Sequence, residues 1–180
     1  MDECVKITTP TIEGVPYRSE GLWAVPRDLA AGLYEVESVA FFTDGVSRGD
    51  VVRCEPDGEH RLVAVEVIER SGGATLLLCP VVDPDGVDDR LRHLAEDLQA
   101  RFADELAVEG GMGMLTVVFD RAVEAKVVGA IATHGAGGGS VDLVQQRLGD
   151  WYFHTVAYPA WPAPQRLAGA EELLAATEAW

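Results

Sequence analysis

The sequence lacks several features that would assign a protein to a membrane or secreted class. No apolar run approaches the roughly twenty residues that a helix needs to span a bilayer. The N-terminal residues 1–3 lack the basic start and apolar centre of a signal peptide. Only three cysteines occur, widely spaced at Cys4, Cys54 and Cys79, which favours free thiols in a reducing compartment. We therefore expect a soluble, cytoplasmic protein with no disulfide and no membrane contact.

Basic residues are scarce. The chain has 14 lysines and arginines against 30 aspartates and glutamates, for a formal net charge of −16. Such a chain repels a phosphate backbone, and no lysine or arginine cluster offsets the charge locally. An acidic surface also speeds encounter with basic partners, but it more often means only a solvated surface. We therefore expect no nucleic acid partner.

Motifs for metals, phosphates and nucleophiles are missing or out of context. No histidines follow the His-Glu-x-x-His spacing of metal sites. The glycine run at 135–139 follows a predicted helix and lacks the Lys-Ser or Lys-Thr of a phosphate loop. Residues 45–49 match the Gly-x-Ser-x-Gly pattern of a nucleophile elbow, but a strand is predicted after Ser47 where an elbow needs a helix. We expect no metal and no cofactor, and a turn at Ser47.

What the first half does contain is a series of short strand patterns separated by turn residues. Pro56-Asp57-Gly58 supplies turn chemistry between two β-branched runs. Strand-like runs lie at 21–25, 33–36, 51–54, 61–70 and 74–79. This spacing predicts a small antiparallel β-barrel or strongly curved sheet over residues 14–80, preceded by an N-terminal tail at residues 1–13.

The second half changes to helical periodicity and predicts an α+β subdomain over residues 81–158. Apolar residues recur every three to four positions in two stretches. The first predicted helix spans 87–107, and the second has an apolar stripe from Val123 to Ile131 and is ended by Gly135. A short third helix is predicted between Ser140 and Gly149, and the predicted strands span 114–119 and 151–157. The order β-α-β-α-β resembles part of a ferredoxin-like fold. The overall expectation is an α+β protein with a barrel-like first half.

The last residues, 159–180, read as a proline-rich connector followed by a helix at 171–179. An isolated helix of this length is marginal in water, so it should dock on a larger surface. Trp161 and Trp180 could anchor the contact. We expect docking on the same chain, and a homodimer is the alternative.

Two histidines and one carboxylate are candidates for acid–base chemistry: His154 in the last predicted strand, His134 at a helix end, and Glu66. Each also has a structural interpretation. His134 could complement the negative end of its helix, and His154 alternates with Tyr152 along the strand.

Glu66 lies in a strand whose valines share the opposite face, so we expect it to point outward. If it were buried, it would need a partner such as Arg53 or Arg70, or its pKa would rise.

Aromatic residues suggest a binding surface instead. Trp23, Phe41, Phe42, Trp151 and Tyr152 could line a groove between the two halves. A binding or accessory protein that takes a protein segment or a small molecule there is the favoured function. The alternative is a small cofactor-independent enzyme of a specialised metabolic pathway that uses the histidines with a carboxylate.

Several short motifs resemble one known family. They are Leu22-Trp23-Ala24, Phe41-Phe42, Gly45-Val46-Ser47, Gly49-Asp50-Val51-Val52 and Arg70-Ser71-Gly72. Together they resemble a bacterial family catalogued as domain of unknown function four-two-six-five, over roughly residues 20 to 158. The resemblance implies an α+β fold with a β-rich beginning. It conveys no reaction, so it assigns no catalytic residue, and turn chemistry explains Asp50, Arg70 and Ser71.

Overall fold

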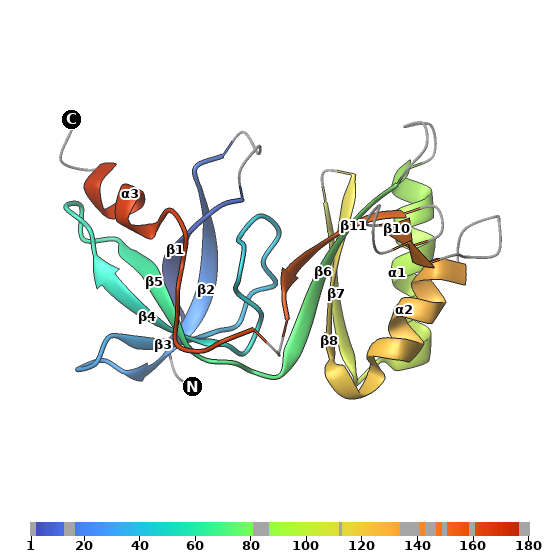
Figure 1. Cartoon of the computed structure of the whole chain (residues 1–180), viewed down its shortest axis with the longest axis horizontal. Helices are drawn as coiled ribbons and strands as arrows, with labels where there is room; N and C mark the ends of the chain where they lie inside the picture. The colour runs from blue at the N-terminus through green and yellow to red at the C-terminus, as the bar shows by residue number, and fades with distance from the viewer. Residues whose placement is uncertain are drawn as a thin grey trace. The chain divides into compact units, whose positions relative to one another are not determined.

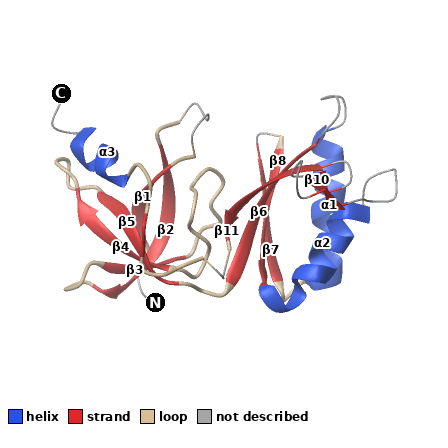
Figure 2. Ribbon diagram, in the orientation of Figure 1, coloured by secondary structure: helices blue, strands red, loops and turns tan. Residues whose placement is uncertain are grey.

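The computed structural model describes residues 3–12, 17–80, 87–111, 113–133, 141–142, 147–148, 151–158 and 161–176. The chain divides into two compact units, Met1–Gly73 with Val156–Trp180, and Ala74–Thr155 (Figure 1). The fold is mixed α+β, as predicted. The first unit contains a closed barrel and the second a separate sheet with helices (Figure 2).

The barrel of the first unit has five strands. They are β1 (Val5–Pro10), β2 (Ser19–Asp28), β3 (Leu33–Val36), β4 (Val51–Pro56) and β5 (Leu62–Glu69). Each strand is antiparallel to the next. A parallel pairing of β1 with β5, which sets Ile7 opposite Leu62, closes the barrel. The barrel was predicted to be antiparallel, but the pair of strands that closes it, β1 and β5, is parallel. Strand β1 also lies within residues 1–13, which were predicted to be an N-terminal tail.

Alternate strand residues fill the barrel core. On β5 the side chains of Val63, Val65 and Val67 are buried, as Ile7 on β1 is. Full burial of an aliphatic side chain of this size contributes about 1.5–3 kcal/mol. Cys54, on β4, belongs to the same core, and burial raises the pKa of its thiol to about 12.

The β4–β5 hairpin turns at Pro56-Asp57-Gly58, as predicted. The Asp57 carboxylate accepts hydrogen bonds from the backbone N–H groups of Glu59 and Arg61, both at 2.9 Å, and from Arg61 Nε at 2.7 Å. Desolvation acts against the ionised carboxylate, but these hydrogen bonds outweigh it and hold the pKa of Asp57 below its usual value.

The C-terminal segment packs on the barrel. Strand β12 (Gln165–Arg166) pairs antiparallel with β5, and helix α3 (Ala170–Ala175) packs against β5 and β1. Leu167 and Ala170 are buried there. The described part of the predicted helix therefore docks on its own chain, while Trp180 lies outside the described residues. The homodimer stays a prediction.

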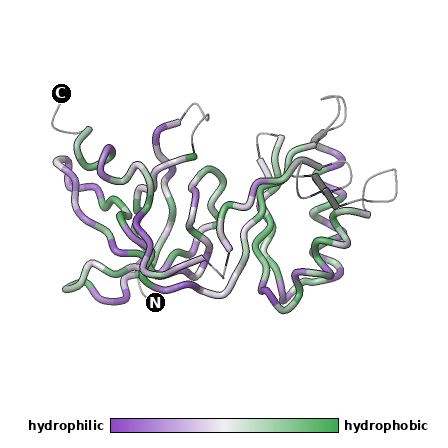
Figure 3. Tube along the Cα trace, in the orientation of Figure 1, coloured by the Kyte–Doolittle hydropathy of each residue, from purple (hydrophilic) through white to green (hydrophobic). Residues whose placement is uncertain are grey.

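The second unit has a sheet in the order β7-β8-β6-β11-β10-β9. Its elements are β6 (Gly73–Pro80), α1 (Val87–Phe102), β7 (Leu106–Gly111), β8 (Met114–Asp120), the 3-10 turn η1 (Arg121–Val123), α2 (Glu124–Thr133), β9 (Val141–Asp142), β10 (Arg147–Leu148) and β11 (Trp151–Ala157). Strand β8, which covers the strand predicted at 114–119, is apolar along most of its length and lies inside the sheet (Figure 3).

Three elements of this unit differ from the sequence-based expectation. Strand β6, predicted as part of the barrel, belongs to the second sheet. The predicted helix 87–107 ends at Phe102, and its last residues begin β7. The predicted third helix is wrong, because β9 and β10 form an antiparallel pair and β10 pairs with β11. The resemblance to a ferredoxin-like fold stays a prediction.

Helix α1 covers the sheet above β7. Leu91, Leu94 and Leu98 recur at helical spacing and are buried, and α1 packs mainly against β7. Asp97 and Arg101, one turn apart on α1, form an ion pair at 2.9 Å. No helix among the described residues is both long and apolar enough to cross a membrane.

Candidate functional site

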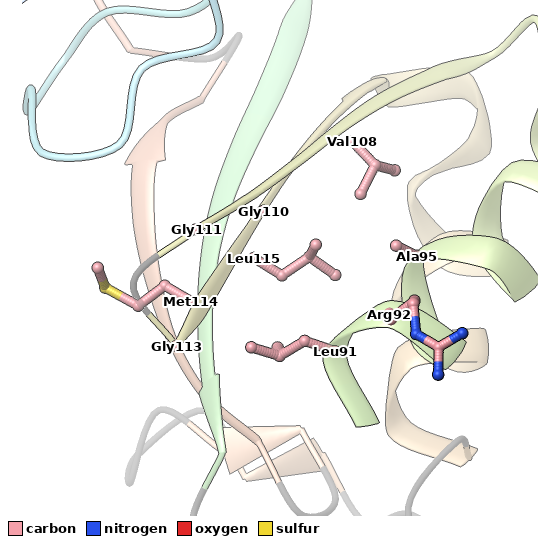
Figure 4. Close-up of a pocket in the computed structure, with 9 residues that line it drawn as sticks. All are labelled: Leu91, Arg92, Ala95, Val108, Gly110, Gly111, Gly113, Met114 and Leu115. Atoms are coloured by element: carbon pink, nitrogen blue, oxygen red, sulfur yellow. The ribbon is translucent and has the colours of Figure 1, made fainter. Parts of the chain in front are cut away.

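A pocket of about 280 Å³ lies between α1 and the β7–β8 hairpin (Figure 4). All of its lining residues belong to the second unit. They are Leu91, Arg92 and Ala95 on α1, Val108, Gly110 and Gly111 on β7, Gly113 in the turn, and Met114 and Leu115 on β8.

The walls of the pocket are apolar. Val108 and Leu115 point from the strands toward α1, and Leu91 points back from the helix (Figure 4). Leu91 and Leu115 are buried, while Ala95 and Val108 are half-buried. Such a surface accepts an aliphatic or aromatic group by removing it from water.

Glycines create the space at the hairpin end. Gly110 shares the face of Val108 and leaves no side chain between the strands and the start of α1, while Gly111 contributes only backbone to the lining. A Cβ added at Gly110 would meet Leu115 Cδ1 at 3.3 Å, whereas one added at Gly111 would meet no atom within 4 Å. Gly113 has a φ of +73°, which favours glycine at the turn. The pocket therefore exists because the hairpin end lacks side chains that would fill it.

The charged residue of the pocket, Arg92, already has partners. Its guanidinium lies 2.7 Å from the Asp89 carboxylate and 3.6 Å from that of Glu96. The hydrogen bond from Arg92 holds the pKa of Asp89 below its usual range. The Arg92 side chain points away from the strands (Figure 4). Arg92 therefore does not offer the pocket an uncompensated positive charge.

Strand β7, which forms one wall, is also an edge of the sheet. It pairs with β8 from Leu106 opposite Phe119 to Gly111 opposite Met114. Within the described part of the chain, no strand pairs with its other side. Alternate residues of such an edge leave backbone N–H and C=O groups unpaired. Among the described residues, the strand at the opposite end, β9, spans two against six in β7. An apolar pocket thus lies beside the longer strand edge.

A second hollow of about 420 Å³ lies in the first unit, between the end of β1 and α3. Its walls mix Arg18 and Glu172 with Leu173. Its neighbours along the chain, 13–16 and 177–180, lie outside the described residues. We therefore take the pocket beside β7 as the candidate site.

The predicted acid–base residues are distributed over both units. Glu66, on β5, forms an ion pair with Arg53 at 2.7 Å, which was one of the partners considered from the sequence. This hydrogen bond raises the pKa of Arg53. His154 is half-buried on β11, in the second unit, and His134 lies outside the described residues. Their catalytic role stays a prediction.

The predicted aromatic residues are also divided. Trp23 is 54% exposed on β2. Phe41 and Phe42 are half-buried in the loop after β3, with ring centroids 6.2 Å apart. Trp151 and Tyr152 belong to β11, for which the structure describes their backbone but not their side chains. The groove that these residues would line stays a prediction.

The motif residues of the first unit hold a loop in place. The Glu20 carboxylate accepts hydrogen bonds from the N–H groups of Phe41, Phe42 and Thr43, and from the Thr43 hydroxyl at 2.8 Å. Ser47 is buried, and strand β4 follows it where a nucleophile elbow would have a helix. The motif residues Phe41, Phe42 and Ser47 therefore have a structural role in ordering this loop.

A buried ion pair fixes the other end of this loop. The Asp50 carboxylate accepts hydrogen bonds from the Ser47 and Ser71 N–H groups, at 3.0 and 2.8 Å, and from Arg70 Nη1 at 3.0 Å. Arg70 also donates to the Gly45 carbonyl and to Gln165 Oε1, each at 2.6 Å. The loop, the end of β5 and β12 therefore meet at one charged pair.

The comparisons with known proteins concern family and fold. The model of the family described as Domain of unknown function (DUF4265) matches residues 20–142. Among solved structures, the chain is similar to a hypothetical protein from Neisseria gonorrhoeae, with a TM-score of 0.55 and 13% identity, over 87% of this chain and 95% of that one. At this identity the likeness shows the fold alone. No curated protein matches the sequence.

Proposed function

The chain belongs to the DUF4265 family, whose description names no reaction, and from its own residues we propose that it is a non-catalytic binding module for an extended polypeptide segment. The segment adds as a strand to the free edge of β7 and places an apolar side chain in the pocket beside it. The observation that carries this proposal is the coincidence of an open strand edge with an apolar pocket.

The backbone of β7 supplies affinity that does not depend on the ligand's sequence. Six residues span roughly 20 Å at about 3.3 Å per residue. Each new main-chain hydrogen bond contributes about 0.5–1.5 kcal/mol net. This mode of recognition, strand addition with a pocket for alternate side chains, is common among peptide-binding domains.

The pocket supplies selectivity, and its lining favours binding over catalysis. Its size lies near the lower limit of ligand pockets, which suits one side chain of a peptide. Among its lining residues only Arg92 is ionisable, and arginine stays protonated in proteins. The pocket therefore holds no general acid or base. The alternative enzyme built on His154, His134 and Glu66 has no supporting geometry among the described residues.

A pair of glycine variants tests the proposal. The full chain is used to select binders from a displayed library of short random peptides, and their affinities are measured by fluorescence anisotropy. Gly110→Leu places a side chain on the pocket face of β7, where its Cβ would lie 3.3 Å from Leu115 Cδ1, and should weaken binding at least tenfold. Gly129→Leu makes the same change on α2, where a Cβ meets no atom within 4 Å, and should leave affinity unchanged.

Hydrogen exchange supplies a second readout. Bound peptide should slow exchange of β7 amides, because their outward N–H groups gain partners. The proposal is overturned if the library yields no binder, if both glycine variants bind equally well, or if protection appears elsewhere than on β7.

A further inference from the structure

We infer that the segment taken by β7 is basic, with apolar and cationic residues in alternation. This inference rests on the proposed function and specifies its partner. The cationic side chains lie over carboxylates on and beside the strand, and the apolar ones face the pocket.

Three carboxylates surround the open edge without a cation of their own. Asp104 and Glu105 lie in the turn that leads into β7, and Glu109 lies on the strand. All three are exposed, and none forms an ion pair with a described residue. Arg92 and Arg101 of α1 have other partners, because Arg92 pairs with Asp89 and Glu96 and Arg101 pairs with Asp97. The edge therefore keeps a negative surface within a chain of net charge −16.

The pleat of the sheet separates the two kinds of side chain. Neighbouring residues of a strand point to opposite faces. Val108 faces α1 and the pocket (Figure 4), so Glu109 lies on the other face. A strand added beside β7 alternates in the same way. Its side chains on the pocket face meet apolar walls, and those on the Glu109 face meet a carboxylate.

Charge also decides between possible occupants. A second copy of this chain would bring its own Glu109 and the same net charge to the edge, and like charges across neighbouring strands are destabilising. Exposed charge on an edge strand is a common protection against such self-pairing. An acidic segment meets the same repulsion. A basic segment gains attraction and a faster encounter.

Three defined peptides test the inference. Each is capped at both ends and as long as β7, and alternates valine with lysine, threonine or glutamate. At low salt the lysine peptide should bind the full chain about tenfold more tightly than the threonine peptide, because a few exposed charge pairs add up to that factor. The glutamate peptide should bind most weakly. The preference should shrink at about 1 M salt, where the screening length falls to about 3 Å.

Charge variants decide whether the preference arises at this edge. Glu109→Gln should lower the lysine-over-threonine ratio about threefold. Glu172→Gln, which removes an exposed carboxylate from α3 in the other unit, should leave it unchanged. If both variants lower the ratio equally, general attraction to an acidic protein explains it and the inference is overturned. Equal binding of lysine and threonine peptides overturns the inference but leaves the proposed function standing. Binding of none of the peptides overturns both.

Discussion

The buried ion pair of Asp50 and Arg70 should stabilise the barrel far more than the shorter pair of Arg53 and Glu66. The Asp50 and Arg70 side chains are 1% and 9% exposed. Removing Asp50 leaves Arg70 buried beside no counter-charge and two backbone N–H groups without their acceptor. Breaking a buried pair in this way costs about 3–5 kcal/mol. We therefore expect Asp50→Ala to lower the free energy of unfolding by about 4 kcal/mol.

The pair of Arg53 and Glu66 is the matched control, because it lies in the same barrel. Its atoms are closer, at 2.7 Å against 3.0 Å, but its side chains are 32% and 19% exposed. Water screens such a pair, and exposed ion pairs contribute about 0–1 kcal/mol. If burial determines the strength of an ion pair, alanine double-mutant cycles should give a coupling free energy of about 2 kcal/mol or more between Asp50 and Arg70. The coupling between Arg53 and Glu66 should be less than about 1 kcal/mol.

Hydrogen exchange of β4 and β5 amides is the suitable assay for these cycles. The chain has two compact units, and a global melting curve mixes the transitions of units that unfold separately. Slowly exchanging amides of the barrel strands report the opening of the barrel itself. Equal couplings for the two pairs, or a larger one for Arg53 with Glu66, would refute the reasoning from burial.

Three further outcomes follow from the first unit. Glu20→Ala should speed amide exchange at residues 41–43 at least tenfold, since that carboxylate accepts their N–H groups; unchanged exchange would mean that other contacts order the loop. Exposed Cys4 should react with a thiol reagent near pH 8 while Cys54 stays protected, because burial raises the pKa of Cys54 to about 12; similar rates in the native protein would contradict this. Asp57 has a lowered folded-state pKa, so its contribution to stability is present above the unfolded value of 3.8 and is lost as the pH falls through the folded one. Asp57→Asn should therefore flatten the acid-side loss of stability, and an unchanged pH profile would count against the hydrogen-bonded turn.

The barrel was predictable where alternation and turn residues agree along the chain. The β4–β5 hairpin carries both signals, and the valines of β5 also predict that Glu66 points outward, which its ion pair with Arg53 fits. Strand β1 pairs antiparallel with β2, the next strand in the sequence, over Val5–Pro10. Its second partner, β5, lies more than fifty residues away along the chain, with Ile7 opposite Leu62, so the closure of the barrel leaves no local signal in the sequence.

Strand β7 was missed for a different reason. Leu106, Ala107 and Val108 continue the apolar spacing of α1, so periodicity extends the helix through them. The chain leaves the helix because these residues pair with β8 from Leu106 opposite Phe119 onward. Pairing with a central apolar strand overrides local propensity, which is weak for so short a segment. Strand pairing also replaces the helix predicted between Ser140 and Gly149, because β10 pairs with β11 and β9 pairs with β10.

The candidate site was hidden because it is formed by absent side chains. Histidines, carboxylates and aromatic residues each carry a chemical signal that is visible in the sequence. The pocket beside β7 depends on Gly110, which only leaves space. The run Gly110-Gly111-Met112-Gly113 was the available signal, but glycines also mark ordinary turns, and only the position of α1 above them makes a pocket.

The family motifs and the proposed site therefore play separate parts. Asp50 and Arg70 match motif positions, but they form an ion pair with each other and hydrogen bonds with backbone groups. A ligand could reach those charges only by breaking contacts that we expect to hold the barrel together. Strand β7 has the opposite properties, because its outer backbone groups and Glu109 have no partner among the described residues. Free hydrogen-bonding groups and uncompensated charge are what a ligand can use, so variants of β7 should change binding without unfolding the barrel, and variants of the motif should do the reverse.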